Sequence, residues 1–119
     1  ESSKEEVSRL FNECKAKTGA KESETDVIDK KIVPTSDAGK CLIECYLSAK
    51  GALKDGKMDI EGSKKWAENT LKGDKEKYAK AVKVIEECAQ TNIEGLDKCS
   101  AAAAYYGCYQ EKKTTGNNE

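Results

Sequence analysis

Apolar residues recur at intervals of three and four along most of the chain, which is the spacing of one face of an α-helix. The first group of such positions comprises Val7, Leu10, Phe11 and Cys14. Ser3 followed by Glu6 forms a capping box at the start of this group, and Gly19 lies just beyond its end, where a helix commonly stops. The pattern therefore predicts a first helix from about Ser3 to about Lys17.

Two further helices are predicted in the first half of the chain. A short one begins at Ser23 and ends before Pro34, because the residue that precedes a proline avoids helical backbone angles. Its apolar positions are Val27, Ile28 and Ile32. The next helix is capped by Ser36 or Asp37 and ends at Gly51.

Three more helices are predicted in the second half, over about residues 59–71, 74–89 and 96–111. Asp55-Gly56 is a turn dipeptide, but it lies between helical stretches and not between alternating apolar residues. A β-hairpin is therefore the less favoured interpretation, and no strand is predicted. Residues 112–119 are polar and are expected to form a mobile tail, so one domain would span 1–119 with a helical core over 1–111.

Composition excludes several classes of function. The 119 residues carry 21 basic and 22 acidic side chains that are interspersed, so no basic field for nucleic acid or an anionic membrane arises. The longest apolar run is a few residues, too short to cross a bilayer. The chain has no His, which removes Ser–His and Cys–His catalytic pairs and imidazole metal ligands. We therefore expect no enzyme, no cofactor and no metal.

Six cysteines in a chain of this size indicate a disulfide framework, which needs an oxidising compartment. The chain begins at Glu1 without Met or an apolar leader, and is interpreted as a mature secreted, extracellular protein. The alternative is a thiolate zinc site in the cytosol. It is disfavoured because zinc sites use close cysteine pairs, whereas these gaps are long and uneven.

Helix geometry limits the disulfide pairing. Cys41 and Cys45 lie four residues apart on one predicted helix, with Cβ atoms about 5–6 Å apart, beyond the span of about 3.5–4.5 Å that a disulfide requires. Cys99 and Cys108 lie nine residues apart on another predicted helix and face opposite sides. Of the 15 pairings that six cysteines allow, excluding these two bonds leaves ten open.

Successive cysteines are separated by 26, 3, 42, 10 and 8 residues. These gaps resemble the six-cysteine signature of the insect odorant-binding proteins, the pheromone-binding and general odorant-binding family, in which the three- and eight-residue gaps are the most constant. The flanking residues Pro34, Lys40, Gly51 and Asp55-Gly56 agree with it. The resemblance implies an all-α fold of six helices around an internal apolar cavity. It also implies three interlocked disulfides, Cys14–Cys45, Cys41–Cys99 and Cys88–Cys108.

The resemblance further implies a pocket for a small hydrophobic ligand. Family pocket positions correspond here to Val7, Ile43, Leu47, Val82, Ile85 and Tyr109. Leu53 and Met58 flank the Asp-Gly turn and are expected at the mouth. Ala102 and Tyr106 share a side of the last predicted helix with Tyr109. Ordinary core packing is the alternative for every one of these residues, because an apolar stripe on a helix usually faces a core.

The aromatic residues have more than one interpretation. Each tyrosine in the group Tyr46, Tyr105, Tyr106 and Tyr109 can offer a hydroxyl to a ligand, or can pack its ring and leave its oxygen in water. Trp66 is the single tryptophan and is expected to pack between helices and not against ligand.

Three functions remain open. The leading hypothesis is a secreted carrier, in sensillum lymph or another body fluid, that solubilises an odorant, pheromone or fatty-acid-like molecule and delivers it to an olfactory receptor. The second keeps the fold but makes the protein a carrier or scavenger in haemolymph, reproductive secretion or saliva. An amine site would need a buried carboxylate, and Glu44 and Glu86 are the nearest candidates. The third is a cysteine-rich protein-binding module without a cavity.

Partners and release follow from the same residues. We expect a monomer or weak homodimer that binds no nucleic acid and does not insert stably into a membrane. The moth pheromone carriers of this family use histidines and an apolar C-terminal segment to release ligand at low pH. This chain has no His, and residues 114–119 are polar, so that mechanism is not expected here.

Overall fold

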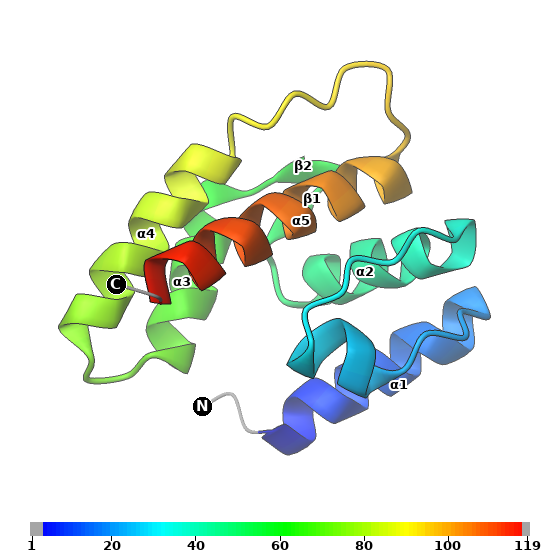
Figure 1. The fold of residues 1–119 in the computed structure, drawn as a ribbon, viewed down its shortest axis with the longest axis horizontal. Helices are drawn as coiled ribbons and strands as arrows, with labels where there is room; N and C mark the ends of the chain where they lie inside the picture. Colours follow the sequence, from blue (N-terminus) through cyan, green and yellow to red (C-terminus); the bar gives the residue numbers. More distant parts are fainter. Residues whose placement is uncertain (1–3, 118–119) are drawn as a thin grey trace.

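Six helices and one short hairpin make up the structure, which is a computed structural model that describes the backbone of residues 4–117 and the side chains of residues 5–112. The elements in chain order are α1 (Lys4–Thr18), the π-helix η1 (Thr25–Asp29), α2 (Asp37–Ala49), β1 (Leu53–Lys54), β2 (Lys57–Met58), α3 (Ile60–Thr70), α4 (Lys75–Cys88) and α5 (Lys98–Asn117). Figure 1 shows α5 running between α2 and α4. The predicted all-α fold of six helices is confirmed.

Side-chain caps fix the starts of three helices where the sequence predicts them. The Ser36 side chain accepts a hydrogen bond from the Gly39 N–H at 3.0 Å. Asp59 begins α3 and Asp74 begins α4 in the same way, because each carboxylate satisfies a backbone N–H that has no partner inside the helix. The capping residue predicted at Ser3 lies outside the described residues.

The prediction that the chain has no strand is wrong at Asp55-Gly56. Leu53 pairs with Met58 in an antiparallel hairpin, and the two turn residues have φ angles of 54° and 81°. Positive φ at both central residues is what a type I′ hairpin turn needs, and Asp-Gly supplies it. The strands are only two residues long, which is too short to show the alternation on which strand prediction depends.

Two other helix boundaries differ from the sequence prediction. The second helix is a π-helix that ends at Asp29, so Ile32 lies beyond it and is exposed. The last helix begins at Lys98 and continues to Asn117, beyond the end expected near Glu111. Helix ends are set by local competition among caps, water and packing, and they are the least predictable part of an element.

The helices form two groups that meet on α5. Helix α1 packs on α2, α3 packs on α4, and α5 packs on both α2 and α4. The larger apolar cluster, which includes Phe11, Leu42 and Ile43, lies among α1, η1, α2 and α5. The smaller cluster consists of Ala67, Ala81 and Ile85 from α3 and α4. Met58 of the hairpin packs against both clusters.

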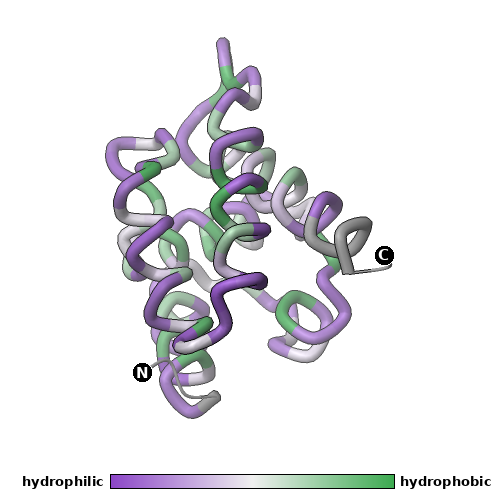
Figure 2. Tube along the Cα trace, turned by 90° about the vertical axis from the view of Figure 1, so that its left-hand side faces the viewer, coloured by the Kyte–Doolittle hydropathy of each residue, from purple (hydrophilic) through white to green (hydrophobic). Residues whose placement is uncertain are grey.

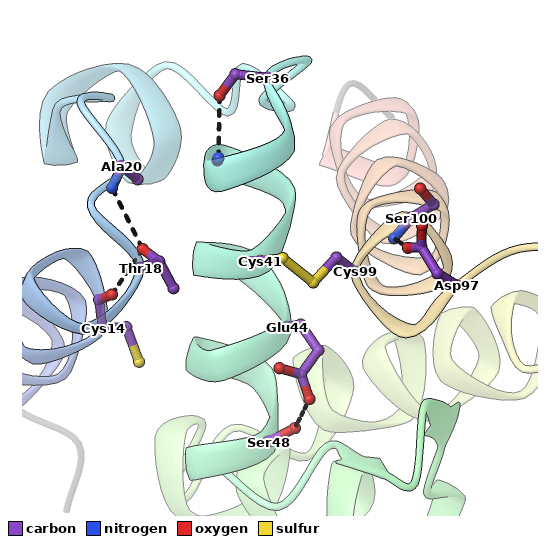
Figure 3. Close-up of a disulfide and its surroundings, with 11 residues drawn as sticks. Cys14, Thr18, Ala20, Ser36, Cys41, Glu44, Ser48, Asp97, Cys99 and Ser100 are labelled. Atoms are coloured by element: carbon purple, nitrogen blue, oxygen red, sulfur yellow. Dashed lines mark hydrogen bonds between the residues drawn. A yellow bond between two sulfur atoms is a disulfide. The ribbon is translucent and has the colours of Figure 1, made fainter.

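Three disulfides tie these helices together. Cys14–Cys45 joins α1 to α2, Cys41–Cys99 joins α2 to α5, and Cys88–Cys108 joins α4 to α5. The structure thus contains the pairs that the resemblance implies. Figure 3 shows the Cys41–Cys99 bond between α2 and α5. Helix α3 contains no cysteine, so it is held by packing and by its flanking turns.

Hydrophobic and hydrophilic residues are interspersed along each helix, as Figure 2 shows. Within the described residues, no helix combines the length and the apolar composition needed to cross a bilayer.

Candidate ligand-binding site

A central cavity of about 220 Å³ lies where the two helix groups meet. Its wall receives side chains from α1, α2, the hairpin, α3, α4 and α5, and from the segment that contains η1. Most of the wall is apolar or aromatic. The lining residues are Val7, Ile28, Lys31, Tyr46, Leu47, Lys50, Ala52, Leu53, Met58, Ser63, Trp66, Thr70, Ile85, Tyr105, Tyr106, Tyr109 and Gln110.

Most of the pocket residues expected from the sequence lie on this one cavity. They are Val7, Leu47, Leu53, Met58, Ile85, Tyr106 and Tyr109. The structure therefore brings together residues that are spread over about a hundred positions of the chain. That these side chains contact a ligand stays a prediction.

Three of the expected residues do not line the central cavity. Ile43 and Ala102 are 0% exposed in the larger cluster, and Val82 is half-buried on α4. Ile43 lies two residues after Cys41, and Ala102 lies three residues after Cys99. Because the disulfide between those cysteines holds α2 against α5 at this level, no space is left there for a cavity.

Three aromatic side chains on the wall were not expected there from periodicity. Periodicity assigns no pocket position to Tyr46 or Tyr105, although either hydroxyl could be offered to a ligand. For Trp66 the sequence predicts packing between helices and not against ligand. Trp66 does pack, since its ring contacts Tyr109 edge to face with the ring centroids 6.4 Å apart. It also lines the central cavity. A large indole can do both, because it has two faces and a long edge.

The charged groups on the wall are lysines. The Lys50 ammonium lies 4.4 Å from the centroid of the Tyr46 ring and 4.3 Å from that of Trp66. A cation at this distance is attracted by the negative face of each ring. Lys31 also lines the cavity, and no acidic side chain among the described residues does. The charge on this wall is therefore positive.

Three tyrosines on the wall, Tyr46, Tyr106 and Tyr109, are neutral donors. The Tyr106 hydroxyl donates a hydrogen bond to the Val27 carbonyl at 2.8 Å, which links α5 to η1. Burial raises the pKa of Tyr106 to about 12, and burial also raises the pKa values of Tyr46 and Tyr109. None of the three is ionised near neutral pH. The Tyr106 hydroxyl is already committed to the backbone, so a ligand would have to displace that bond to use it.

Neither carboxylate considered for an amine site lies on the cavity. Glu44 is half-buried on α2 and accepts a hydrogen bond from the Ser48 hydroxyl at 3.0 Å (Figure 3). Glu86 is 54% exposed and pairs with Lys64 at 3.2 Å. Neither carboxylate is fully buried, and neither lines the cavity. In the part of the chain that the structure describes, no group of acidic or cysteine side chains is arranged to hold a metal ion.

Disulfide-linked helices around an apolar cavity define the class of small helical ligand-binding proteins. The sequence matches the PBP/GOBP family over residues 1–112, so the chain belongs to this family. The resemblance found in the cysteine spacing is thereby confirmed. The family is one of binding proteins that take small hydrophobic ligands.

Similar proteins come from flies. General odorant-binding protein 19d of Drosophila melanogaster is 29% identical over 118 residues, which cover 98% of this chain and 78% of that protein. General odorant-binding protein 28a of the same species is 30% identical over 111 residues, which cover 90% of this chain and 77% of that protein.

Two solved structures share the fold. Odorant-binding protein dmelOBP28a from Drosophila melanogaster superimposes with a TM-score of 0.78 at 27% identity, and the match covers 93% of this chain and 92% of that one. A fatty acid binding protein, OBP56a from the oral disk of the blowfly Phormia regina, gives a TM-score of 0.68 at 24% identity over 97% of both chains. At that identity the second likeness concerns the fold alone.

Proposed function

We propose that this protein is a secreted carrier that holds a small hydrophobic molecule in the central cavity, keeps it dissolved in an extracellular fluid and delivers it to a receptor. The observation that carries the proposal is the apolar and aromatic wall of a cavity that lies among disulfide-linked helices. The names of the fly relatives support an odorant or a similar small molecule as the cargo.

Apolar burial supplies the affinity. Each 100 Å² of apolar ligand surface removed from water is worth about 2.5 kcal/mol at 25 cal/mol per Å². Association costs about 4 kcal/mol or more in lost freedom of motion. A dissociation constant of about 1 μM, or about 8 kcal/mol, therefore needs at least about 500 Å² of apolar ligand surface to be buried.

The charges on the wall favour neutral or acidic cargo over amines. Lys31 and Lys50 line the cavity, whereas Glu44 and Glu86 do not. An ammonium group would meet like charge without a carboxylate to compensate its loss of water, which is unfavourable. An amine scavenger is therefore not favoured by this site. The cavity itself argues against a protein-binding module without a ligand.

Displacement of an apolar fluorescent probe, such as N-phenyl-1-naphthylamine, tests the proposal. We expect the oxidised protein to bind the probe at micromolar or better affinity, and unbranched alcohols, esters or acids to compete. Ala52→Phe places a ring in the cavity and should weaken probe binding at least tenfold. Ala79→Phe, on an exposed position of α4, is the matched control and should bind as the wild type does. No probe binding by folded wild-type protein would refute the carrier function.

A further inference from the structure

A second apolar space, here called the side chamber, lies between α3, α4 and α5. Its volume is about 110 Å³, and its apolar wall includes Ala67, Leu71, Ala81 and Val84. Three lysines and no acidic side chain complete the charged part of its lining among the described residues. Because the rest of its wall is largely apolar, the side chamber is suited to the apolar end of a ligand.

One layer of side chains separates the side chamber from the central cavity. Trp66, Thr70 and Tyr109 line both spaces. The Trp66 and Tyr109 rings meet edge to face, with centroids 6.4 Å apart and planes at 68°. This arrangement is a favourable contact between aromatic rings. These two rings thus form the larger part of the wall between the two spaces, and that wall is here called the partition.

On the α3 side, the Trp66 ring of the partition is fixed neither by a hydrogen bond of the indole nor by a disulfide on α3. The Trp66 Nε1 atom is buried and has no hydrogen-bond partner among the described residues. Helix α3, which carries Trp66 and Thr70, contains no cysteine. Helices α4 and α5 on the opposite side are joined by Cys88–Cys108. The indole is held by the ring contact with Tyr109, by the cation contact with Lys50 and by packing against the smaller cluster.

We propose that the Trp66–Tyr109 partition sets the longest unbranched chain that the carrier accepts, and that the side chamber is an extension of the binding site for the ends of longer chains. The inference rests on the proposed carrier function. With the partition closed, a chain end that reaches the two rings has no further apolar surface to cover. When the Tyr109 ring is removed, the central cavity and the side chamber become one continuous space for the carbon chain of the ligand.

The expected effect follows from methylene burial. Each methylene group that leaves water is worth about fourfold in affinity. In the wild type, the affinity for unbranched primary alcohols should rise by about this factor per carbon and level off once the chain end reaches the partition. In Tyr109→Ala the rise should continue, so that two further methylenes give about a sixteenfold gain for the longer alcohols.

Competition against the fluorescent probe by primary alcohols from hexanol to hexadecanol measures this limit. Tyr109→Phe keeps the ring and should reproduce the wild-type curve. Tyr78→Ala removes a tyrosine ring from the same apolar cluster but not from the partition, so it should also retain the wild-type limit. Ala81→Leu added to Tyr109→Ala refills the side chamber and should abolish the gain. Tyr109→Leu replaces Tyr109→Ala if the latter does not fold.

The outcomes separate the two proposals. A shift of the limit to longer alcohols in Tyr109→Ala, lost again on adding Ala81→Leu, supports the partition. Curves for Tyr109→Ala and the wild type that level off at the same length overturn it, and so does an equal shift in Tyr78→Ala. A wild-type protein that binds neither the probe nor any alcohol refutes the carrier function itself, and the partition with it.

Discussion

The hydrogen bond between Tyr106 and Val27 allows a sharp test of what holds the cavity wall together. The Tyr106 hydroxyl donates to the Val27 carbonyl at 2.8 Å across 79 positions of the chain. Val27 is 1% exposed and lies in η1, one residue before the cavity residue Ile28. Tyr106→Phe keeps the ring in the wall and removes the donor alone. It leaves the Val27 carbonyl buried without that partner.

The magnitude follows from the cost of an unsatisfied buried carbonyl, which is about 1–3 kcal/mol. A domain of 119 residues unfolds with an entropy of about 250 cal/mol/K at the average per-residue value. Each kcal/mol therefore lowers the melting temperature by about 4 °C, and Tyr106→Phe should lower it by about 4–12 °C.

Thermal unfolding of the oxidised protein, followed by circular dichroism, measures the difference. Tyr78→Phe is the matched control, because Tyr78 is half-buried on α4 and its hydroxyl makes no hydrogen bond with another described residue. That control should change the free energy of unfolding by less than about 0.5 kcal/mol. If Tyr106→Phe melts within 1 °C of the wild type, the bond contributes no net stability and the reasoning is wrong.

Three further predictions follow from the same wall. Lys50→Met removes the ammonium near the Tyr46 and Trp66 rings. It should weaken the binding of an unbranched acid about tenfold and leave the binding of the alcohol of equal length unchanged. Lys83→Met, on the exposed side of α4, is the control, and an equal loss of acid binding in that variant would contradict a local role of Lys50. Ligand affinity should change less than tenfold between pH 7 and pH 5, with or without residues 114–119. The reason is that the chain has no His and that no described acidic side chain lines the central cavity. A larger loss of affinity at pH 5 would contradict the prediction. The free energy of unfolding should fall as pH rises from 10 to about 12, because the folded state holds the Tyr106 proton up to a pKa of about 12 while the unfolded state loses it near 10. The decline should be smaller in Tyr106→Phe, and equal declines in the variant and the wild type would contradict this assignment.

Local chemistry explains why much of the fold could be predicted. The caps at Ser36, Asp59 and Asp74 depend on residues a few positions away, so the helix starts can be read from the sequence. The Asp55-Gly56 turn also has a sequence signal, but the strands on either side do not, because two-residue strands are too short to show alternation. The π-helix has no comparable sequence signal, and the Tyr106–Val27 bond that ties it to α5 joins residues 79 positions apart.

For the candidate site, the sequence predicts which face of a helix points inward, but not which residues on that face reach the cavity. Helical periodicity places Ile43 and Leu47 on nearly the same face of α2, yet Leu47 alone lines the cavity. What separates them is their level along the helix, because the Cys41–Cys99 bond holds α2 against α5 beside Ile43. Ala102, three residues after Cys99, lies near the same bond and does not line the cavity either. Cysteine spacing can suggest such a bond only through resemblance, and the depth of each residue follows from how the tied helices pack.

A crystal structure of the oxidised protein with a bound fluorescent probe tests the central claim most directly. The claim is that the cavity between the two helix groups, and not an external groove, holds the hydrophobic ligand. We expect electron density for the probe inside the cavity, in contact with Leu47, Met58 and Tyr109. An ordered probe on the outer surface, with those three side chains packed against one another and no density between them, would contradict the account.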